Sequence, residues 1–288
     1  MTGETGHKLR GDYSGMHADY TVEQEWDRYS AEEHVLWRRL YARQAGLVEK
    51  YACPEFKETL ARLDFHTGIP RFAVVNRMLE SATRWQLVAV PGLVPDLVFF
   101  EHLANRRFPV TVWLREPEEF DYIVEPDVFH DFFGHVPMLF NPVFADYMQA
   151  YGRGGIKAHA LGAIEMLARL YWYTVEFGLI ESDGRLCPYG AGILSSGGEI
   201  SYCVDSSDPN RIGFDLLRIM QTRYKIDTYQ ESYFVIRGFD ELFRATEPDF
   251  APYYEKLKGR EAYTPSAVLA TDRVYHRGAN PVRSASAA

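Results

Sequence analysis

Residues 166–179 predict an almost entirely apolar helix that carries one acidic side chain, Glu176, and ends near Gly178. Burying a carboxylate is costly unless it is paired with a cation or bound to a metal. Arg169 and Arg115 are candidate ionic partners, and ligation of a metal ion is the alternative. Any fold that the chain adopts must therefore bring a positive charge to Glu176.

Two histidines, His130 and His135, lie five residues apart in a second predicted helix. Pro126 suits the first turn of this helix, and Gly134 with Pro137 suits its end. Residues five apart in a regular α-helix point about 140° away from each other, against about 40° for the spacing of four found in zinc proteases. The imidazoles can therefore converge only if the helix loosens near Gly134, through a bulge or an unwound end.

The histidine pair alone is a short motif that also fits two unrelated polar residues at a helix end. Together with Glu176 it supplies the two imidazoles and one carboxylate of the facial triad of non-haem iron(II) oxygenases, which leaves coordination positions open. No His-Glu-x-x-His occurs in the chain, which disfavours zinc-protease chemistry. Zinc accepts the same ligand types, so these donors alone leave the metal undecided.

Residues 189–203 form a third distinctive stretch, rich in glycine and serine. These residues allow close backbone approach and offer hydroxyl and amide groups to a polar ligand. The stretch has neither the Gly-Lys-Ser/Thr of a Walker loop nor a Gly-x-Gly-x-x-Gly motif, so a plain turn is the alternative interpretation.

Apolar residues recur at helical spacing over most of the chain, and strand-like runs are short. A capping box of Ser30 and Glu33 predicts the start of a helix that reaches about Glu49. Further helices are predicted near 55–64, 70–81, 95–105, 142–150, 160–178, 212–223 and 238–246, with strands at 86–90, 110–113, 193–194 and 233–236. This pattern indicates a mainly α fold with a few short β-strands (α+β) and no doubly wound sheet.

Neither a linker nor an internal repeat interrupts residues 21–263. We expect this range to form a single compact domain between a flexible N-terminal segment, residues 1–20, and a flexible C-terminal tail, residues 264–288.

Charge and composition exclude several classes of partner. The net charge of −9 and the isoelectric point near 5.5 argue against binding nucleic acid. No run approaches the ~20 apolar residues of a membrane span, and no signal segment is recognisable, so we expect a cytoplasmic protein. The cysteines, Cys53, Cys187 and Cys203, have no metal-like spacing and are expected to be reduced.

Three stretches resemble, in order and spacing, the pterin-dependent aromatic amino acid hydroxylases. They are Glu-Pro-Asp-x-x-His-Asp-x-x-Gly-His-Val-Pro at 125–137, Tyr-Trp-x-Thr-Val-Glu-Phe-Gly-Leu at 171–179 and Tyr-Gly-Ala-Gly-x-Leu-Ser-Ser-x-Gly-Glu at 189–199. The resemblance covers about residues 85–250 and is to the short bacterial members, which have a catalytic domain alone. It implies the catalytic-domain fold of that family.

The resemblance implies that His130, His135 and Glu176 bind a catalytic iron(II), with no further catalytic side chain. It also implies a tetrahydropterin cosubstrate similar to tetrahydrobiopterin. The positions that match the family's pterin site are Gly92, Leu93, Val94, Phe99, Asp131, Ala168 and Tyr171. Asp131 stands where glutamate is more usual.

For the amino-acid substrate, the resemblance implies that Arg115 binds the carboxylate and that Asp127 holds this arginine in place. A threonine common at one substrate position of the animal enzymes is Ile123 here. The walls of the amino-acid pocket are implied at Pro126, Trp172, Phe177, Gly192, Ser195 and Ser196.

The activity implied is hydroxylation of L-phenylalanine to L-tyrosine with dioxygen, as in phenylalanine catabolism, by a chain expected to be a monomer. The iron and pterin motifs do not separate phenylalanine from tryptophan or tyrosine, so the same chemistry on those amino acids is one alternative. A zinc-dependent hydrolase that uses the same His/His/Glu site is an alternative from another class, and it would need no dioxygen.

Overall fold

The computed structural model describes residues 10–63 and 65–279, about half of them helical. The helices are α1 (Ala31–Tyr51), α2 (Pro54–Arg62), α3 (Phe72–Thr83), α4 (Asp96–Ala104), α5 (Val136–Leu139), α6 (Pro142–Ala160), α7 (Ile164–Tyr171), α8 (Ala191–Ser195), α9 (Glu199–Asp205), α10 (Leu216–Met220), α11 (Phe239–Thr246) and α12 (Ala251–Leu257). The strands are β1 (Gln86–Val90), β2 (Arg107–Thr111), β3 (Leu179–Ser182), β4 (Arg185–Pro188), β5 (Asn210–Gly213), β6 (Ser232–Ile236) and β7 (Val274–His276). Short 3-10 turns span Trp26–Arg28 and Pro117–Glu119, and π-helices span His130–His135 and Trp172–Glu176. The predicted mainly α class with few strands is confirmed.

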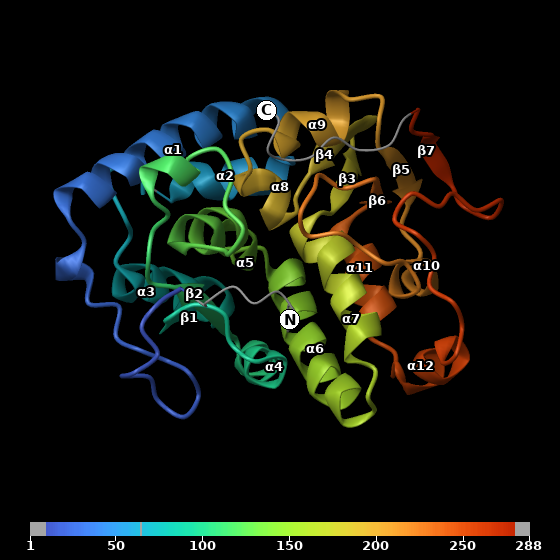
Figure 1. Cartoon of the computed structure of the whole chain (residues 1–288), viewed down its shortest axis with the longest axis horizontal. Helices are drawn as coiled ribbons and strands as arrows, with labels where there is room; N and C mark the ends of the chain where they lie inside the picture. The colour runs from blue at the N-terminus through green and yellow to red at the C-terminus, as the bar shows by residue number, and fades with distance from the viewer. Residues whose placement is uncertain (1–9, 64, 280–288) are drawn as a thin grey trace.

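The elements surround a central pair of helices, α6 and α7 (Figure 1). In this view α6 and α7 cross the middle, α1 runs along the upper left, and the larger sheet lies to the right. Within the described residues, no helix is both long and apolar enough to cross a membrane.

Helix α1 begins at the predicted capping box. The Glu33 N–H donates to Ser30 Oγ at 3.1 Å, and the Ser30 N–H donates to Glu33 Oε2 at 2.7 Å. From its buried face, Gln44 Nε2 donates to the carbonyl oxygens of Leu194 and Ser196, each at 2.9 Å. Helix α1 thereby holds the segment around α8, where several of the implied pocket residues lie.

The strands form two separate sheets. Strands β1 and β2 pair in parallel, and the larger sheet has the order β4-β3-β6-β5-β7, with β4 and β7 antiparallel to their neighbours. The strand predicted at 86–90 is confirmed, and the predictions at 110–113 and 233–236 overlap β2 and β6. The strand predicted at 193–194 is wrong, because these residues lie in α8. Two apolar residues are too short a run for periodicity to separate a strand from a helix.

The predicted helix boundaries differ most around the middle of the chain. The helix expected at 160–178 begins at Ile164 and changes to a π-helix at Trp172. The helix expected at 142–150 extends to Ala160, and the one expected at 212–223 is reduced to α10 because β5 takes its first residues. Helices α9 and α12 were not predicted; both are short, with seven residues each, so neither displays two full periods of an apolar pattern.

Helices α4 and α6 approach each other closely through glycine. A Cβ built on Gly152 would lie 2.4 Å from the backbone nitrogen of Ala104, and one on Gly155 would lie 2.1 Å from the ring of Phe100. Because no side chain separates them, the two backbones pack at a distance that only glycine permits at these positions.

We expect Gly152→Ala to lower the free energy of unfolding by about 1–3 kcal/mol, because the added methyl group meets backbone that cannot move aside. The matched control is Gly154→Ala in the same helix, where nothing lies within 4 Å of the added Cβ. Alanine should stabilise that position by roughly 0.5–1 kcal/mol through helix propensity. Urea denaturation of both variants checks the prediction, and equal effects would contradict it.

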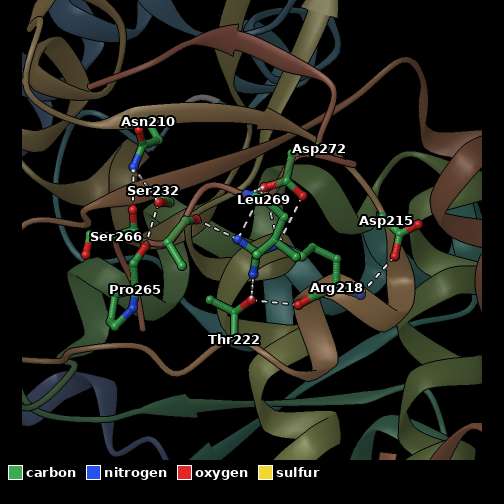
Figure 2. Close-up of polar contacts among 10 residues, drawn as sticks. Asn210, Asp215, Arg218, Thr222, Ser232, Pro265, Ser266, Leu269 and Asp272 are labelled. Atoms are coloured by element: carbon green, nitrogen blue, oxygen red, sulfur yellow. Dashed lines mark hydrogen bonds and ion pairs between the residues drawn. The ribbon is translucent and has the colours of Figure 1, made fainter. Parts of the chain in front are cut away.

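The segment 263–279, here named the C-terminal strap, is fastened to β5, β6 and α10 (Figure 2). Arg218 Nε lies 3.1 Å from Asp272 Oδ1, and both side chains are buried. Asn210 Nδ2 donates to the Ser266 carbonyl at 3.2 Å, and Ser232 Oγ donates to the Pro265 carbonyl at 2.6 Å. The sequence analysis expects a flexible tail from residue 264. It does not reveal these polar side-chain contacts, because they produce no periodic pattern in the sequence.

Part of the predicted N-terminal segment also contacts the body of the protein. Arg10 pairs with Glu119 at 2.7 Å, and the Tyr13 hydroxyl donates to the Leu93 carbonyl at 3.0 Å. The remainder of the two predicted flexible ends, residues 1–9 and 280–288, lies outside the described residues.

Candidate functional site

Both candidate ligand segments are π-helices. The segment His130–His135 is π-helical, and so is Trp172–Glu176, which closes with a hydrogen bond from the Phe177 N–H to the Trp172 carbonyl at 2.9 Å. This i→i+5 pattern is wider than an α-helical turn and changes which residues share a face. The prediction that the helix must loosen near Gly134 is therefore confirmed.

The three candidate metal donors converge. His135 Nε2 lies 3.1 Å from Glu176 Oε1, and His130 Nε2 lies 3.7 Å from Glu176 Oε2. The two imidazole rings are 5.2 Å apart at 82°. One carboxylate thus faces the Nε2 atoms of both histidines.

Neither arginine proposed as an ionic partner of Glu176 takes that role. Arg169 pairs with Glu165 and donates to the Met220 carbonyl, while Arg115 pairs with Asp127. Glu176 is only 9% exposed. This buried acid was expected either to pair with an arginine or to bind a metal ion, and the geometry favours the metal ion.

The protonation states suit metal binding. Burial lowers the pKa of His130 to about 4, so its imidazole is neutral at physiological pH. Burial alone raises the pKa of Glu176, but the adjacent His135 and His130 lower it by more, and the carboxyl group is ionised. A neutral imidazole and an ionised carboxylate are the forms in which His130 and Glu176 can donate lone pairs to a metal.

Ser195 orients the imidazole of His130. The Ser195 hydroxyl donates to the Ala191 carbonyl at 2.8 Å, and the same oxygen lies 2.8 Å from His130 Nδ1. Because the hydroxyl proton is engaged by the carbonyl, His130 donates from Nδ1, which leaves the lone pair of Nε2 toward Glu176. The serine expected in a pocket wall therefore also supports a candidate ligand.

Asp131 is a second carboxylate near the histidines. It can place an oxygen within 4.8 Å of ligand atoms of both His130 and His135. Its Oδ2, however, accepts the Thr111 N–H at 2.8 Å, and burial raises its pKa to about 7. Glu176 contacts both Nε2 atoms directly, so we assign Glu176 as the third donor and leave Asp131 beside the site.

Two of the implied pterin positions, Phe99 and Tyr171, lie on the His135 side of the donors. Phe99, on α4, meets Tyr171 edge to face at 5.6 Å, and Tyr171 stacks beside His135 at 6.3 Å. Tyr171 is also one of the groups that lower the pKa of Glu176. The other positions are Gly92, Leu93 and Val94 in the loop between β1 and α4, and Ala168, half-buried on α7.

Arg115 and Asp127, which the resemblance assigns to the substrate, form a buried ion pair. Arg115 Nε lies 2.8 Å from Asp127 Oδ2, Nη2 lies 3.0 Å from Oδ1, and the Arg115 backbone N–H also donates to Oδ2. The other Asp127 interaction is with the His130 N–H at 2.9 Å, so the same carboxylate connects Arg115 to the histidine segment. The implied role of Asp127 in holding Arg115 agrees with this geometry.

Trp172, the first residue of the second π-helix, and Phe177, directly after it, form an aromatic wall. Trp172 lies 4.7 Å from Phe177 and stacks on Tyr224 at 4.3 Å and 14°. A Cβ on Gly192 would lie 2.7 Å from Phe177 Cζ, so glycine there makes room for the ring. The remaining implied pocket residues, Pro126 and Ser196, are half-buried in the flanking segments.

Sequence reasoning missed Tyr224 and Gln230, which support Trp172, and Thr111, which holds Asp131. None of them belongs to a recognisable motif, and Gln230 lies 58 residues from its partner in the chain. Glu199, in the third motif but without an assigned role, is buried and accepts the Tyr233 hydroxyl at 2.6 Å.

Burial raises the pKa of Glu199 to about 7, although the Tyr233 hydroxyl and the Gln230 N–H oppose the shift. A raised pKa in the folded state means that Glu199 stabilises the protein below its ordinary pKa of about 4.5, and that this contribution is lost as the pH rises through 7. Glu199→Gln should therefore gain stability relative to the parent protein between pH 5 and 8, by an amount of order 3 kcal/mol. Urea denaturation at both pH values checks this, with exposed Glu165→Gln as the control; a constant difference would contradict it.

Comparison with known proteins agrees with this site. The family model for biopterin-dependent aromatic amino acid hydroxylases matches residues 7–258. The phenylalanine-4-hydroxylase of Chromobacterium violaceum is 60% identical over 261 residues, 90% of this chain and 88% of that protein, and that of Ralstonia nicotianae is 55% identical over 285 residues, 96% and 91%. The crystal structure of the C. violaceum phenylalanine hydroxylase bound to cobalt has a TM-score of 0.88 and 60% identity, covering 90% of this chain and 94% of that one. With three donors converging as the motifs require, the chain belongs to the biopterin-dependent aromatic amino acid hydroxylases.

Proposed function

We propose that this chain hydroxylates L-phenylalanine to L-tyrosine, with iron(II), dioxygen and a tetrahydropterin. The observation that carries the proposal is the convergence of His130, His135 and Glu176 beside the aromatic wall of Trp172 and Phe177. The names of the relatives, phenylalanine-4-hydroxylases at 55–60% identity, favour phenylalanine over other aromatic amino acids.

Two imidazoles and one carboxylate fit a non-haem iron(II) ion, because three protein donors leave positions open for the reaction. When bound, the iron and the tetrahydropterin supply dioxygen activation and the two electrons that the substrate does not provide. Ser195 keeps Nε2 of His130 available, and burial keeps the imidazole neutral.

The side chains of this protein then orient the substrate. Arg115 engages Asp127 through Nε and Nη2, so it offers Nη1 to the carboxylate of the amino acid. Trp172 and Phe177 hold the aromatic ring toward the donors. On the opposite side, Phe99 offers a ring face to the pterin beside Tyr171. No side-chain nucleophile or general base is needed.

The proposal is tested by incubating the purified protein with iron(II), tetrahydrobiopterin and air, and with phenylalanine, tryptophan or tyrosine in turn. We expect tyrosine as the main product, with the highest kcat/KM for phenylalanine. Faster turnover of tryptophan or tyrosine would instead support the same chemistry on that amino acid.

The zinc-hydrolase alternative is separated by two further conditions. Hydroxylation should stop under argon and should not be supported by zinc in place of iron(II). A hydrolytic activity that persists without dioxygen would overturn the proposal.

We also propose that residues 21–263 hold the catalytic unit, that the chain acts as a monomer, and that it works in the cytoplasm. Cys53, Cys187 and Cys203 are free, which suits a reducing compartment. Light scattering on the purified protein should give a single species near 33.1 kDa; a larger species would contradict the monomer.

A further inference from the structure

The indole of Trp172 has one directional contact in addition to its stacking. Its Nε1–H donates to Gln230 Oε1 at 2.8 Å. Stacking on Tyr224 and contact with Phe177 hold the plane of the ring, but a half-turn about the Cβ–Cγ bond returns the ring to the same plane with its other edge toward the pocket. The hydrogen bond therefore selects which edge of the indole faces the pocket.

Gln230 is itself held in one orientation. Its side chain is 3% exposed, and Nε2 lies 3.3 Å from the Lys225 carbonyl. An indole N–H can only donate and a backbone carbonyl can only accept, so both partners require the same arrangement of the Gln230 amide. The oxygen is thus presented to Trp172 and the nitrogen to the loop.

The backbone of Gln230 is anchored separately. Its N–H donates to Glu199 Oε1 at 3.1 Å, and the same oxygen accepts the Tyr233 hydroxyl. Glu199 is the last residue of the glycine-rich third motif and the first residue of α9. A chain of contacts therefore runs from that motif through Gln230 to the wall of the proposed substrate pocket.

The loop that carries Gln230 is fixed where it leaves α10. The Arg223 N–H donates to the Tyr263 carbonyl at 3.0 Å, at the start of the C-terminal strap. The Tyr173 hydroxyl donates to the Arg223 carbonyl at 2.7 Å. Since Tyr173 directly follows Trp172, the loop and the wall are joined at two points.

We propose that Gln230 is a positioning residue that sets the orientation of Trp172 and thereby the fit of the substrate ring. The inference rests on the proposed function, because it takes Trp172 as a wall of the phenylalanine pocket. Without the hydrogen bond, the indole N–H is left unsatisfied and the ring can turn, which loosens the pocket for phenylalanine and admits a larger ring.

Gln230→Leu tests the proposal in the iron-loaded enzyme. We expect KM for phenylalanine to rise about three- to tenfold, the range typical of one lost hydrogen bond, with a smaller change in kcat. The preference for phenylalanine over tryptophan, expressed as the ratio of kcat/KM values, should fall. Gln230→Glu keeps an oxygen acceptor for the indole and should retain more of this preference.

The matched control is Gln221→Leu, in the segment that precedes the same loop. Gln221 Nε2 donates to the Glu261 carbonyl at 2.8 Å, in an exposed contact that does not involve Trp172. This variant removes a glutamine hydrogen bond of similar length and should leave both KM and the substrate preference unchanged. An equal effect in the two variants would show that Gln230 acts only through general loop stability and would overturn the proposal.

A double-mutant cycle isolates the pair. In a Trp172→Phe background there is no indole N–H, so Gln230→Leu should change KM by less than twofold. A full effect of Gln230→Leu in that background would also overturn the proposal.

A spectroscopic measurement separates this inference from the function on which it rests. In the iron-free protein labelled with ¹⁵N-tryptophan, the indole N–H signal of Trp172 is identified by its absence in Trp172→Phe. Gln230→Leu should move that signal upfield, and Gln230→Glu should move it less. An unchanged signal would refute the positioning role whatever the substrate, whereas failure of the parent enzyme to make tyrosine would refute the proposed function alone. If Gln230→Leu does not fold, Gln230→Glu carries the same comparison.

Discussion

Glu176→Ala should abolish tyrosine formation and release the iron. The two imidazoles that remain cannot complete three donors, and even residues that only support a metal ligand change affinity or activity by about 10–100-fold. We therefore expect a loss of activity of at least about 100-fold, and less than one iron per chain after gel filtration. Metal analysis and product quantification with phenylalanine measure the two effects.

Glu165→Ala is the control for this variant. Glu165 lies on the adjoining α7, its side chain is 79% exposed, and it pairs with Arg169 rather than with the donors. It should retain iron and activity. Full iron content and full activity in Glu176→Ala would show that another carboxylate, with Asp131 the nearest, completes the site.

Asp127→Ala should be the most destabilising single change at the substrate side. Arg115 and Asp127 are 4% and 0% exposed, so the substitution leaves a buried guanidinium without its counter-charge. Removing one partner of a buried pair costs about 3–5 kcal/mol. Urea denaturation of the iron-free protein measures this loss, and KM for phenylalanine should rise in whatever fraction remains folded.

Asp121→Ala offers the contrast, because Asp121 pairs with Arg43 while its side chain is 82% exposed. An exposed pair of this kind contributes about 0–1 kcal/mol. If both variants lost the same stability, the burial of the Arg115–Asp127 pair would not be what makes it important.

The parts of the fold that could be predicted from the sequence are those governed by local chemistry. The capping box of Ser30 and Glu33 predicted where α1 begins, and the short strand-like run at 86–90 predicted β1. The C-terminal strap could not be predicted, since Arg218 lies 54 residues from Asp272 and the contact depends on tertiary folding. Residues 193–194 were predicted as a strand because so short an apolar run has no period of its own.

The candidate site likewise contains residues that could be predicted from the sequence and residues that could not. Motif residues such as His130 and Glu176 could be predicted, and their spacing even required a departure from the α-helix. Gln230 and Tyr224 could not, because their importance comes from contacting Trp172 across more than fifty residues. Ser195 was predicted in the pocket, yet its hydrogen bond to His130 depends on how α8 meets the first π-helix.

The two π-helices also bear on how the site tolerates a change in gene length. Each contains one residue more than an α-helical turn requires, so each corresponds to a single extra codon. Deleting one codon between those for His130 and His135 would leave the reading frame and every donor intact. The histidines would then have the spacing of four that shares a face of an ordinary α-helix. Removing that extra residue closes the segment as an ordinary α-helix and leaves the helix beyond it facing as it does in the parent protein. The same deletion within a regular helix such as α6 would instead turn everything beyond it by about 100°. The two π-helices are therefore the places where this site can absorb a change of one residue in chain length.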